Sequence, residues 1–258
     1  MCLALFAHKV ISGYPLLFLA NRDEFYDRPT AAADFWKDTP SVLGGHDLRM
    51  GGTWLGVTRN ARFAAVTNFR KGFTQKKNAP SRGRLVSDFL QGNEKAEDYL
   101  RRLEQRADDY DGFNLLLGEA GEIYYYANHG GELKQLAPGF YGLSNHLLDT
   151  PWPKVERGKS RLAALFATAQ PPDSEALFAV LAERHIAADA ELPDTGVGLE
   201  WERMLSPAFI ITPDYGTRSS TLLFIGSDRR IKFIERSFER GVKAVTVSYE
   251  FVIPSTGS

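Results

Sequence analysis

Short hydrophobic runs separated by turn-forming residues occupy most of the chain, a pattern typical of strands. The first two runs, residues 2–8 and 15–21, are hydrophobic at both odd and even positions, so we expect both faces of these strands to be covered. Ser12-Gly13 between them predicts a two-residue hairpin turn. Further strands are expected at residues 53–58, 62–68, 113–118, 122–127, 208–212, 218–225, 231–236 and 242–252.

Hydrophobic residues spaced three and four apart predict helices in two zones. The first covers residues 83–105 with a break near Gly92, and the second covers 154–168 and 173–186. Strand-rich ends around helical zones indicate an α+β fold in which two stacked sheets are covered by helices. Since no internal repeat or clear linker divides the chain, we predict one domain over residues 1–258.

Composition and charge narrow the classes of function. The chain is 43% hydrophobic and 24% charged with a net charge of -1, which is typical of a globular protein and disfavours nucleic acid and membrane surfaces as partners. Its single cysteine excludes an internal disulfide and a cysteine-based zinc site. No export signal or membrane-length hydrophobic run is present, so we expect a cytoplasmic protein without stable membrane insertion and without a metal site. The oligomeric state is not predicted.

Cys2, the only cysteine, directly follows Met1. Removal of Met1 would give one residue both a thiol and an α-amine, whose pKa of about 7.7 to 8.0 suits it to take the thiol proton. The alternative is a small hydrophobic side chain at the start of a buried strand.

The predicted hairpin connects Cys2 to a charged cluster. A two-residue turn places Cys2 opposite Asp23 and within reach of Asn21, Arg22 and Glu24. Arg22 can lower the pKa of the thiol, and a carboxylate can orient the terminal amine. A purely structural Arg22–Asp23 ion pair is the alternative.

The tetrad Asn21-Arg22-Asp23-Glu24 is the one that names the NRDE family, also called the transport and Golgi organisation protein 2 family, and the chain resembles this family. Further matching blocks lie at residues 51–56, 68–70, 111–116, 142–145, 148–155 and 215–221. The resemblance implies an N-terminal nucleophile hydrolase-like fold, a four-layer αββα sandwich with two antiparallel sheets.

Within that fold, the layout is similar to that of the choloylglycine hydrolase and penicillin V acylase group. The resemblance implies the catalytic candidates Cys2, Arg22, Asp23, Asn68, Asn145 and Arg218. The two asparagines could donate to an oxyanion, with strand-end caps as the alternative. Arg218 could bind a carboxylate or support the cysteine, or form a structural ion pair. The tetrad departs from the Arg-Asn-x-Asp arrangement of that group, so it stays open whether Asp23 or Glu24 faces the amine.

Two functions follow from the resemblance. One is hydrolysis of an amide or thioester, such as an acyl amide or an acyl-coenzyme A-like substrate, without a required cofactor. The other is non-catalytic haem binding and trafficking in the same cleft, with His146, His129 or Cys2 as candidate iron ligands. The basic residues between 70 and 84 could attract phosphates or haem propionates, or could simply be a solvated loop. The ligand-binding candidates are Asn21, Glu24, Trp54, Arg70 and His146.

Overall fold

A computed structural model of the protein describes residues 2–72, 76–119, 121–167 and 173–254, and for Cys2 it describes the backbone alone. Within these residues the strands form two antiparallel sheets. The six-stranded sheet has the order β10 (Gly139–Leu143), β1 (Cys2–Ile11), β2 (Tyr14–Phe25), β11 (Tyr215–Ile225), β12 (Arg230–Glu239) and β13 (Val242–Val252). The seven-stranded sheet has the order β3 (Thr30–Phe35), β4 (Val42–Asp47), β5 (Leu55–Thr58), β6 (Phe63–Asn68), β7 (Phe113–Glu119), β8 (Glu122–Ala127) and β9 (Lys134–Gln135).

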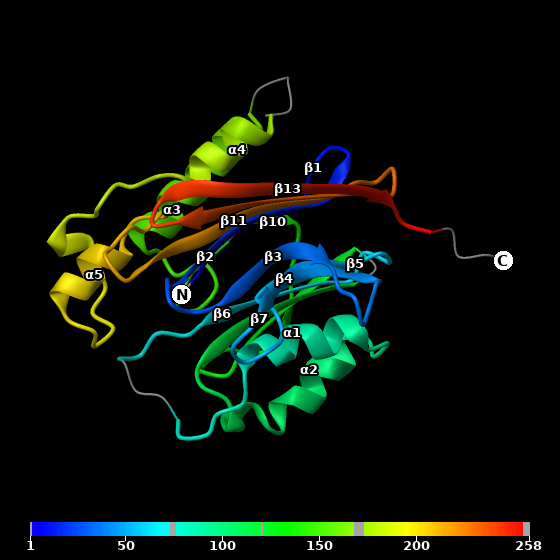
Figure 1. Cartoon of the computed structure of the whole chain (residues 1–258), viewed down its shortest axis with the longest axis horizontal. Helices are drawn as coiled ribbons and strands as arrows, with labels where there is room; N and C mark the ends of the chain where they lie inside the picture. The colour runs from blue at the N-terminus through cyan, green and yellow to red at the C-terminus, as the bar shows by residue number, and fades with distance from the viewer. Residues whose placement is uncertain (1, 73–75, 120, 168–172, 255–258) are drawn as a thin grey trace.

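The helices cover the outer faces of the two sheets (Figure 1). Helices α1 (Arg82–Gln91) and α2 (Ala96–Glu104) pack on the seven-stranded sheet, and α3 (Pro153–Leu165) and α4 (Ser174–Leu181) pack on the six-stranded sheet. A shorter helix, α5 (Leu199–Leu205), precedes β11. The predicted αββα sandwich with two antiparallel sheets is therefore confirmed. None of the described helices is long and hydrophobic enough to cross a membrane.

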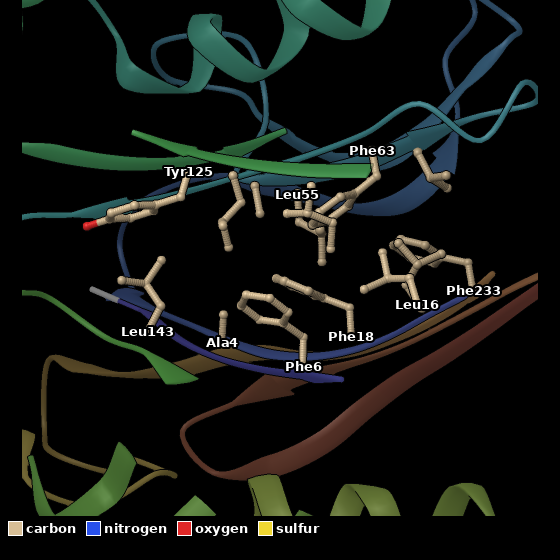
Figure 2. Packing of buried hydrophobic residues seen from close by; sticks show 14 of the residues in the cluster. Ala4, Phe6, Leu16, Phe18, Leu55, Phe63, Tyr125, Leu143 and Phe233 are labelled. Carbon is tan, nitrogen blue, oxygen red and sulfur yellow. The ribbon is translucent and has the colours of Figure 1, made fainter. Parts of the chain in front are cut away.

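Strand β1 shows why its sequence is hydrophobic at every position. Ala4 and Phe6 face the core between the sheets, whereas Leu3 and Leu5 face the helices. Figure 2 shows the inter-sheet core, where the ring of Phe18 reaches across from β2 towards that of Phe63 in β6. The two ring centroids are 4.8 Å apart. Each inner strand is thus buried on both faces, as the sequence pattern predicts.

The first hairpin has the predicted turn but a different register. Ile11 pairs with Tyr14 across Ser12-Gly13, yet a bulge at Lys9, whose φ is +53°, shifts the rest of the ladder by one residue. The backbone of Cys2 consequently pairs with Arg22. The predicted pairing of Cys2 with Asp23 is wrong because the extra residue lies inside the strand and leaves the turn unchanged.

The other predicted hairpins and the helix break near Gly92 are confirmed, and the boundaries elsewhere differ. Residues 208–212 form no strand beyond a single bridge at Ile211; they are hydrophobic because they are mostly buried in the connection from α5 to β11. Helix α4 ends at Leu181, where its carbonyl accepts a hydrogen bond from the side chain of Asn21, instead of extending to Ile186. The sequence analysis did not predict β3, β4, β9, β10 or α5.

The turn between β4 and β5 depends on two glycines with positive φ, +73° at Gly51 and +78° at Gly52. A Cβ at Gly52 would lie 2.5 Å from the carbonyl carbon of Gly83 in α1, whereas a Cβ at Gly51 would meet open space. The turn can therefore approach the start of α1 closely only with glycine at position 52.

We expect Gly51→Ala to lower the free energy of unfolding by about 1 to 2 kcal/mol, the cost of a left-handed backbone for a residue with a Cβ. Gly52→Ala should lower it further because the backbone of α1 must also move. Urea unfolding of both variants measures the difference. Equal losses would mean that the close approach to Gly83 does not constrain the fold.

Candidate active site

Arg22 lies at the end of β2 on the inter-sheet side and is 5% exposed. Its guanidinium lies 4.3 Å from the ring centroid of Trp54 and donates a hydrogen bond of 3.1 Å to Thr30 Oγ1. The carboxylate of Glu24 is 4.0 Å away. Since the backbone of Cys2 pairs with Arg22, the start of β1 lies beside a fixed buried cation.

A second carboxyl group is buried behind Arg22. Glu235 of β12 is 2% exposed, accepts a 2.7 Å hydrogen bond from the backbone N–H of Ala33 in β3, and also accepts one from Thr221 Oγ1. Burial raises the pKa of Glu235, and the charge of Arg22 opposes this rise. Glu235 therefore joins β12 of the six-stranded sheet to β3, the edge strand of the seven-stranded sheet, next to Arg22.

Asp23 is 1% exposed and accepts a 2.7 Å hydrogen bond from Thr217 Oγ1 in β11. Burial raises the pKa of Asp23, and the charge of Lys154 is foremost among the side-chain interactions that oppose the rise. Lys154, at the start of α3, is 2% exposed and donates to the carbonyl of Leu205 over 2.9 Å. The sequence analysis did not select Lys154 as a site residue, because only the packing of α3 against the sheet brings it near Asp23.

Asn68 and Asn145 lie side by side. The side-chain amide of Asn145, which is fully buried, donates to the carbonyl oxygen of Asn68 over 2.9 Å. The side chain of Asn68 is partly exposed and lines two adjoining cavities. Its amide group can therefore contact a ligand there.

A buried chain of hydrogen bonds supports the two asparagines. Tyr125 donates to Asn114 over 2.7 Å, Asn114 donates to Thr67 over 3.1 Å, and Thr67 donates to the carbonyl oxygen of Ser144 over 2.8 Å. This chain crosses β8, β7 and β6 and reaches the segment after β10. It fixes the backbone that carries Asn68 and Asn145.

Two adjoining cavities open around these residues. The first, of about 390 Å³, is lined by Arg22, Asp23, Trp54, Asn68 and the start of α1. The second, of about 510 Å³, is lined by charged and polar residues and by four large aromatic side chains, which we call the aromatic wall. Glu24, Arg28, Asn68 and Arg82 line both, so we describe them together as the cleft. The residues of the aromatic wall are Phe25, Phe69, Trp201 and Tyr215.

Asn21 lies outside the cleft and is fully buried. Its amide group donates to the carbonyl oxygens of Leu181 and Ala208 over 2.8 and 2.7 Å, and its oxygen accepts a 2.6 Å hydrogen bond from Ser220 Oγ. Both amide hydrogens are therefore used within the protein. This geometry gives Asn21 a structural role and does not agree with the expected ligand contact.

Arg218 is the extra residue of a bulge in β11, between Thr217 and Ser219. Its guanidinium donates to the carbonyl oxygens of Phe25 and Tyr26 over 2.9 and 3.1 Å. Arg218 lines neither cavity of the cleft, and these bonds fix the segment that follows β2. It acts on the cleft through the position of that segment.

Arg70 is buried and pairs with Glu202 of α5 at 2.8 Å, with its guanidinium 4.6 Å from the ring centroid of Trp152. Burial lowers the pKa of Arg70, and the charge of Glu202 opposes this change. The ion pair connects the segment after β6 to α5. The guanidinium of Arg70 therefore interacts mainly with groups inside the protein.

His146 lines a further cavity of about 510 Å³, together with Phe69, His129 and Trp152. This cavity adjoins the cleft, because Phe69 and His129 line both. Its Nδ1 lies 2.9 Å from Thr150 Oγ1, and that hydroxyl donates to the carbonyl oxygen of Leu147. Nδ1 must therefore be the donor, which leaves Nε2 as an unprotonated acceptor. Burial, followed by the charge of Arg70, lowers the pKa of His146 and favours this neutral form.

The described residues contain no group of three or more His, Cys, Asp or Glu side chains that could hold a metal ion. The cleft places the cation Arg22, the carboxyl groups of Asp23 and Glu24 and the amide of Asn68 around the start of β1.

Comparison with known proteins identifies the family. The profile of the family described as "Transport and Golgi organisation 2" matches residues 1–240. The chain belongs to this family. It is 37% identical to the bovine transport and Golgi organization protein 2 homolog and 34% identical to the human one, with 95% of each chain covered. It is 30% identical to the Drosophila melanogaster protein, with 87% of each chain covered.

Two solved structures show the same fold at very low sequence identity. The C2A mutant of the conjugated bile acid hydrolase from Clostridium perfringens has a TM-score of 0.55 at 9% identity, with 97% of each chain covered. The Caenorhabditis elegans ortholog of N-acylethanolamine-hydrolyzing acid amidase has a TM-score of 0.52 at 10% identity, with 86% of this chain and 92% of the other covered. The chain therefore has the fold of the N-terminal nucleophile hydrolases.

The burial of Asp23 makes stability depend on pH, and the charge of Lys154 opposes this effect. Because the pKa of Asp23 is raised in the folded state, the folded protein binds more protons than the unfolded one above pH 3.8, and stability falls as pH rises. Lys154→Met removes an opposing cation and should cost about 3 kcal/mol at pH 7, with a smaller loss at pH 4. Urea unfolding at both pH values measures this.

The double variant Asp23→Asn with Lys154→Met should regain most of the loss at pH 7, because no buried carboxylate is left without its cation. Lys159→Met, on the same helix but in a partly exposed pair with Asp149, is the matched control and should cost less than about 1 kcal/mol. A double variant no more stable than Lys154→Met alone would show that the two charges do not interact.

Proposed function

We propose that the protein, after removal of Met1, is an N-terminal nucleophile hydrolase in which Cys2 attacks an amide or thioester carbonyl. The observation that carries the proposal is the register of β1 on β2. It puts the backbone of Cys2 opposite Arg22, which lines the cleft together with Asp23 and Asn68. The fold supports the proposal, because N-terminal nucleophile hydrolases use this architecture.

In the proposed mechanism, the α-amine of Cys2 takes the thiol proton, and the nearby Arg22 guanidinium lowers the pKa of the thiol. The thiolate attacks the carbonyl carbon, and the carbonyl electron pair moves onto oxygen. Asn68, which lines the cleft, donates to this oxyanion, and the buried amide of Asn145 holds the backbone of Asn68 in place. As the oxyanion collapses, the bond to the leaving nitrogen or sulfur breaks, and the ammonium returns its proton to that atom. Water, deprotonated by the amine, then hydrolyses the thioester and frees Cys2.

The two carboxylates of the tetrad have different environments. Asp23 is fixed by Thr217 and balanced by Lys154, whereas Glu24 lies on the cleft wall, 4.0 Å from Arg22 and 3.6 Å from Arg28. We assign the orientation of the amine to Asp23 and the positioning of Arg22 to Glu24. The opposing charge of Lys154 keeps Asp23 from raising the pKa of the amine far above neutral.

The cleft suits a substrate with an apolar acyl part and an anionic part. The aromatic wall can bind the acyl part, and Lys76 and Arg82, on the side of the first cavity, can bind the anionic part. Acyl amides and acyl-coenzyme A-like thioesters have this character. The two solved structures of similar fold are named as hydrolases of N-acylethanolamines and of conjugated bile acids, which are also amides with a large apolar acyl part.

The direct test is the intact mass of the purified protein, quenched in acid after exposure to a panel of acyl amides and acyl-coenzyme A thioesters. We expect loss of Met1 and one acyl adduct on Cys2, and no adduct for Cys2→Ala. Asn68→Ala should slow acylation about 100-fold because one oxyanion donor is lost. Asn93→Ala, an exposed asparagine between α1 and α2, is the control and should acylate at the normal rate.

Turnover that survives in Cys2→Ala would refute the mechanism, and so would a mature protein that keeps Met1, since the α-amine of Cys2 would not exist. An unchanged acylation rate in Asn68→Ala would show that Asn68 does not bind the oxyanion, but it would not refute the role of Cys2.

Haem binding and transfer is the second candidate function, and one observation favours it. Nδ1 of His146 donates to Thr150, so Nε2 is an unprotonated donor of an electron pair in a cavity of about 510 Å³. Histidines that bind metals commonly donate their other ring N–H in this way. Lys71 on the same cavity wall can bind a propionate of the haem.

If His146 binds haem iron, titration of the protein with haem will shift the Soret band, and His146→Phe will abolish that shift. His185→Phe, which changes an exposed histidine outside this cavity, should leave the titration unchanged. Saturable binding with the same spectrum in His146→Phe would exclude this histidine as the ligand.

A further inference from the structure

The turn that follows β4 is held in one conformation by the side chain of Asp47. Its carboxylate accepts hydrogen bonds from the backbone N–H groups of Arg49 and Met50 over 3.0 and 3.1 Å, and it pairs with the guanidinium of Arg28 at 2.6 Å. The pair with Arg28 and the bonds to the backbone lower the pKa of Asp47 although burial acts in the opposite direction, so the carboxylate stays ionised. The turn is therefore preorganised.

This fixed turn exposes large apolar side chains. Leu48 is 60% exposed and Met50 is 47% exposed, with the exposed Arg49 between them. Phe25, at the end of β2, is 48% exposed and lines the same cavity wall as Met50. A single exposed apolar side chain is common in proteins. Here a rigid turn exposes Leu48 and Met50 close to the exposed Phe25, and such a group of apolar side chains indicates an interaction surface.

The same rim carries positive charge. Arg49 and Lys71 line the mouth of the cleft together with Phe25 and Met50, and both are exposed. Asp27 is an exposed acidic residue on the neighbouring loop, and the partly exposed Glu24 and Asp111 line the same cavity but are less exposed than the two cations. Because the net charge of the whole protein is only -1, any attraction to an anionic surface has to come from such a local group of cations.

We propose that this rim, formed by Phe25, Leu48, Arg49, Met50 and Lys71, docks the protein on the surface of a bilayer that contains anionic phospholipid. The three apolar side chains enter the headgroup region, and the two cations bind lipid phosphates and carboxylates. The cleft then opens towards the bilayer, so an apolar ligand can pass from lipid to cleft without crossing water. This surface attachment differs from membrane insertion, and it goes beyond the proposed function.

The test is flotation of the full protein with phosphatidylcholine vesicles, with and without one third of phosphatidylserine. We expect binding to the anionic vesicles that weakens with salt. The double change Leu48→Asp with Met50→Asp should reduce the partition coefficient at least about tenfold, because two apolar anchors become anions. Arg49→Glu should also reduce it, and Asp27→Asn should increase it by removing a repulsive charge.

Ile186→Asp is the matched control, since Ile186 is 57% exposed but does not belong to the rim, and it should bind as the unchanged protein does. Circular dichroism should show every variant folded, because the altered side chains are exposed. The proposal is wrong if the protein does not bind anionic vesicles, or if the double variant binds as well as the control. It is also wrong if light scattering shows a dimer that the double variant abolishes, because the rim would then bind a second copy. None of these readouts depends on hydrolysis, so the result is independent of the proposed function.

Discussion

The structure depends on the burial of two opposite charges on consecutive residues of one strand. Side chains alternate along β2, so Arg22 points between the sheets while Asp23 points to the side covered by helices. Both side chains are almost completely buried, and an unpaired buried charge is costly. Each layer therefore has to supply its own partners, Trp54 and Glu235 for the arginine and Thr217 and Lys154 for the aspartate.

This requirement explains the arrangement of neighbouring elements. The bulge in β11 lets Thr217 face Asp23 while Arg218 turns to the carbonyl oxygens of the segment after β2. That segment carries Arg28, whose pair with Asp47 fixes the turn of the seven-stranded sheet. The glycines of this turn allow it to pack against the start of α1. Charges on β2 thereby set the position of a wall of the cleft that belongs to the other sheet.

The sequence predicts two stacked sheets covered by helices, because the hydrophobic residues at every position of β1 and β2 require burial on both faces. It was not sufficient for the register, since the bulge at Lys9 has no turn signal and shifts the position of Cys2 by one residue. The sequence also does not reveal that Lys154 interacts with Asp23, or that Asn21 has a structural role. Their partners, Asp23 for the lysine and the end of α4 for the asparagine, lie far away in sequence and are brought near only by the packing of helices on the sheet.

Two of the blocks shared with the family, residues 111–116 and 142–145, are joined by buried hydrogen bonds through Thr67. Asn114, Thr67 and Ser144 come from three segments of the chain and form one buried polar chain behind Asn68 and Asn145. In a site of low dielectric constant, donors that are already oriented stabilise a developing charge without the cost of reorganisation. The position of Asn68 on the cleft wall therefore depends on buried hydrogen bonds from three segments of the chain.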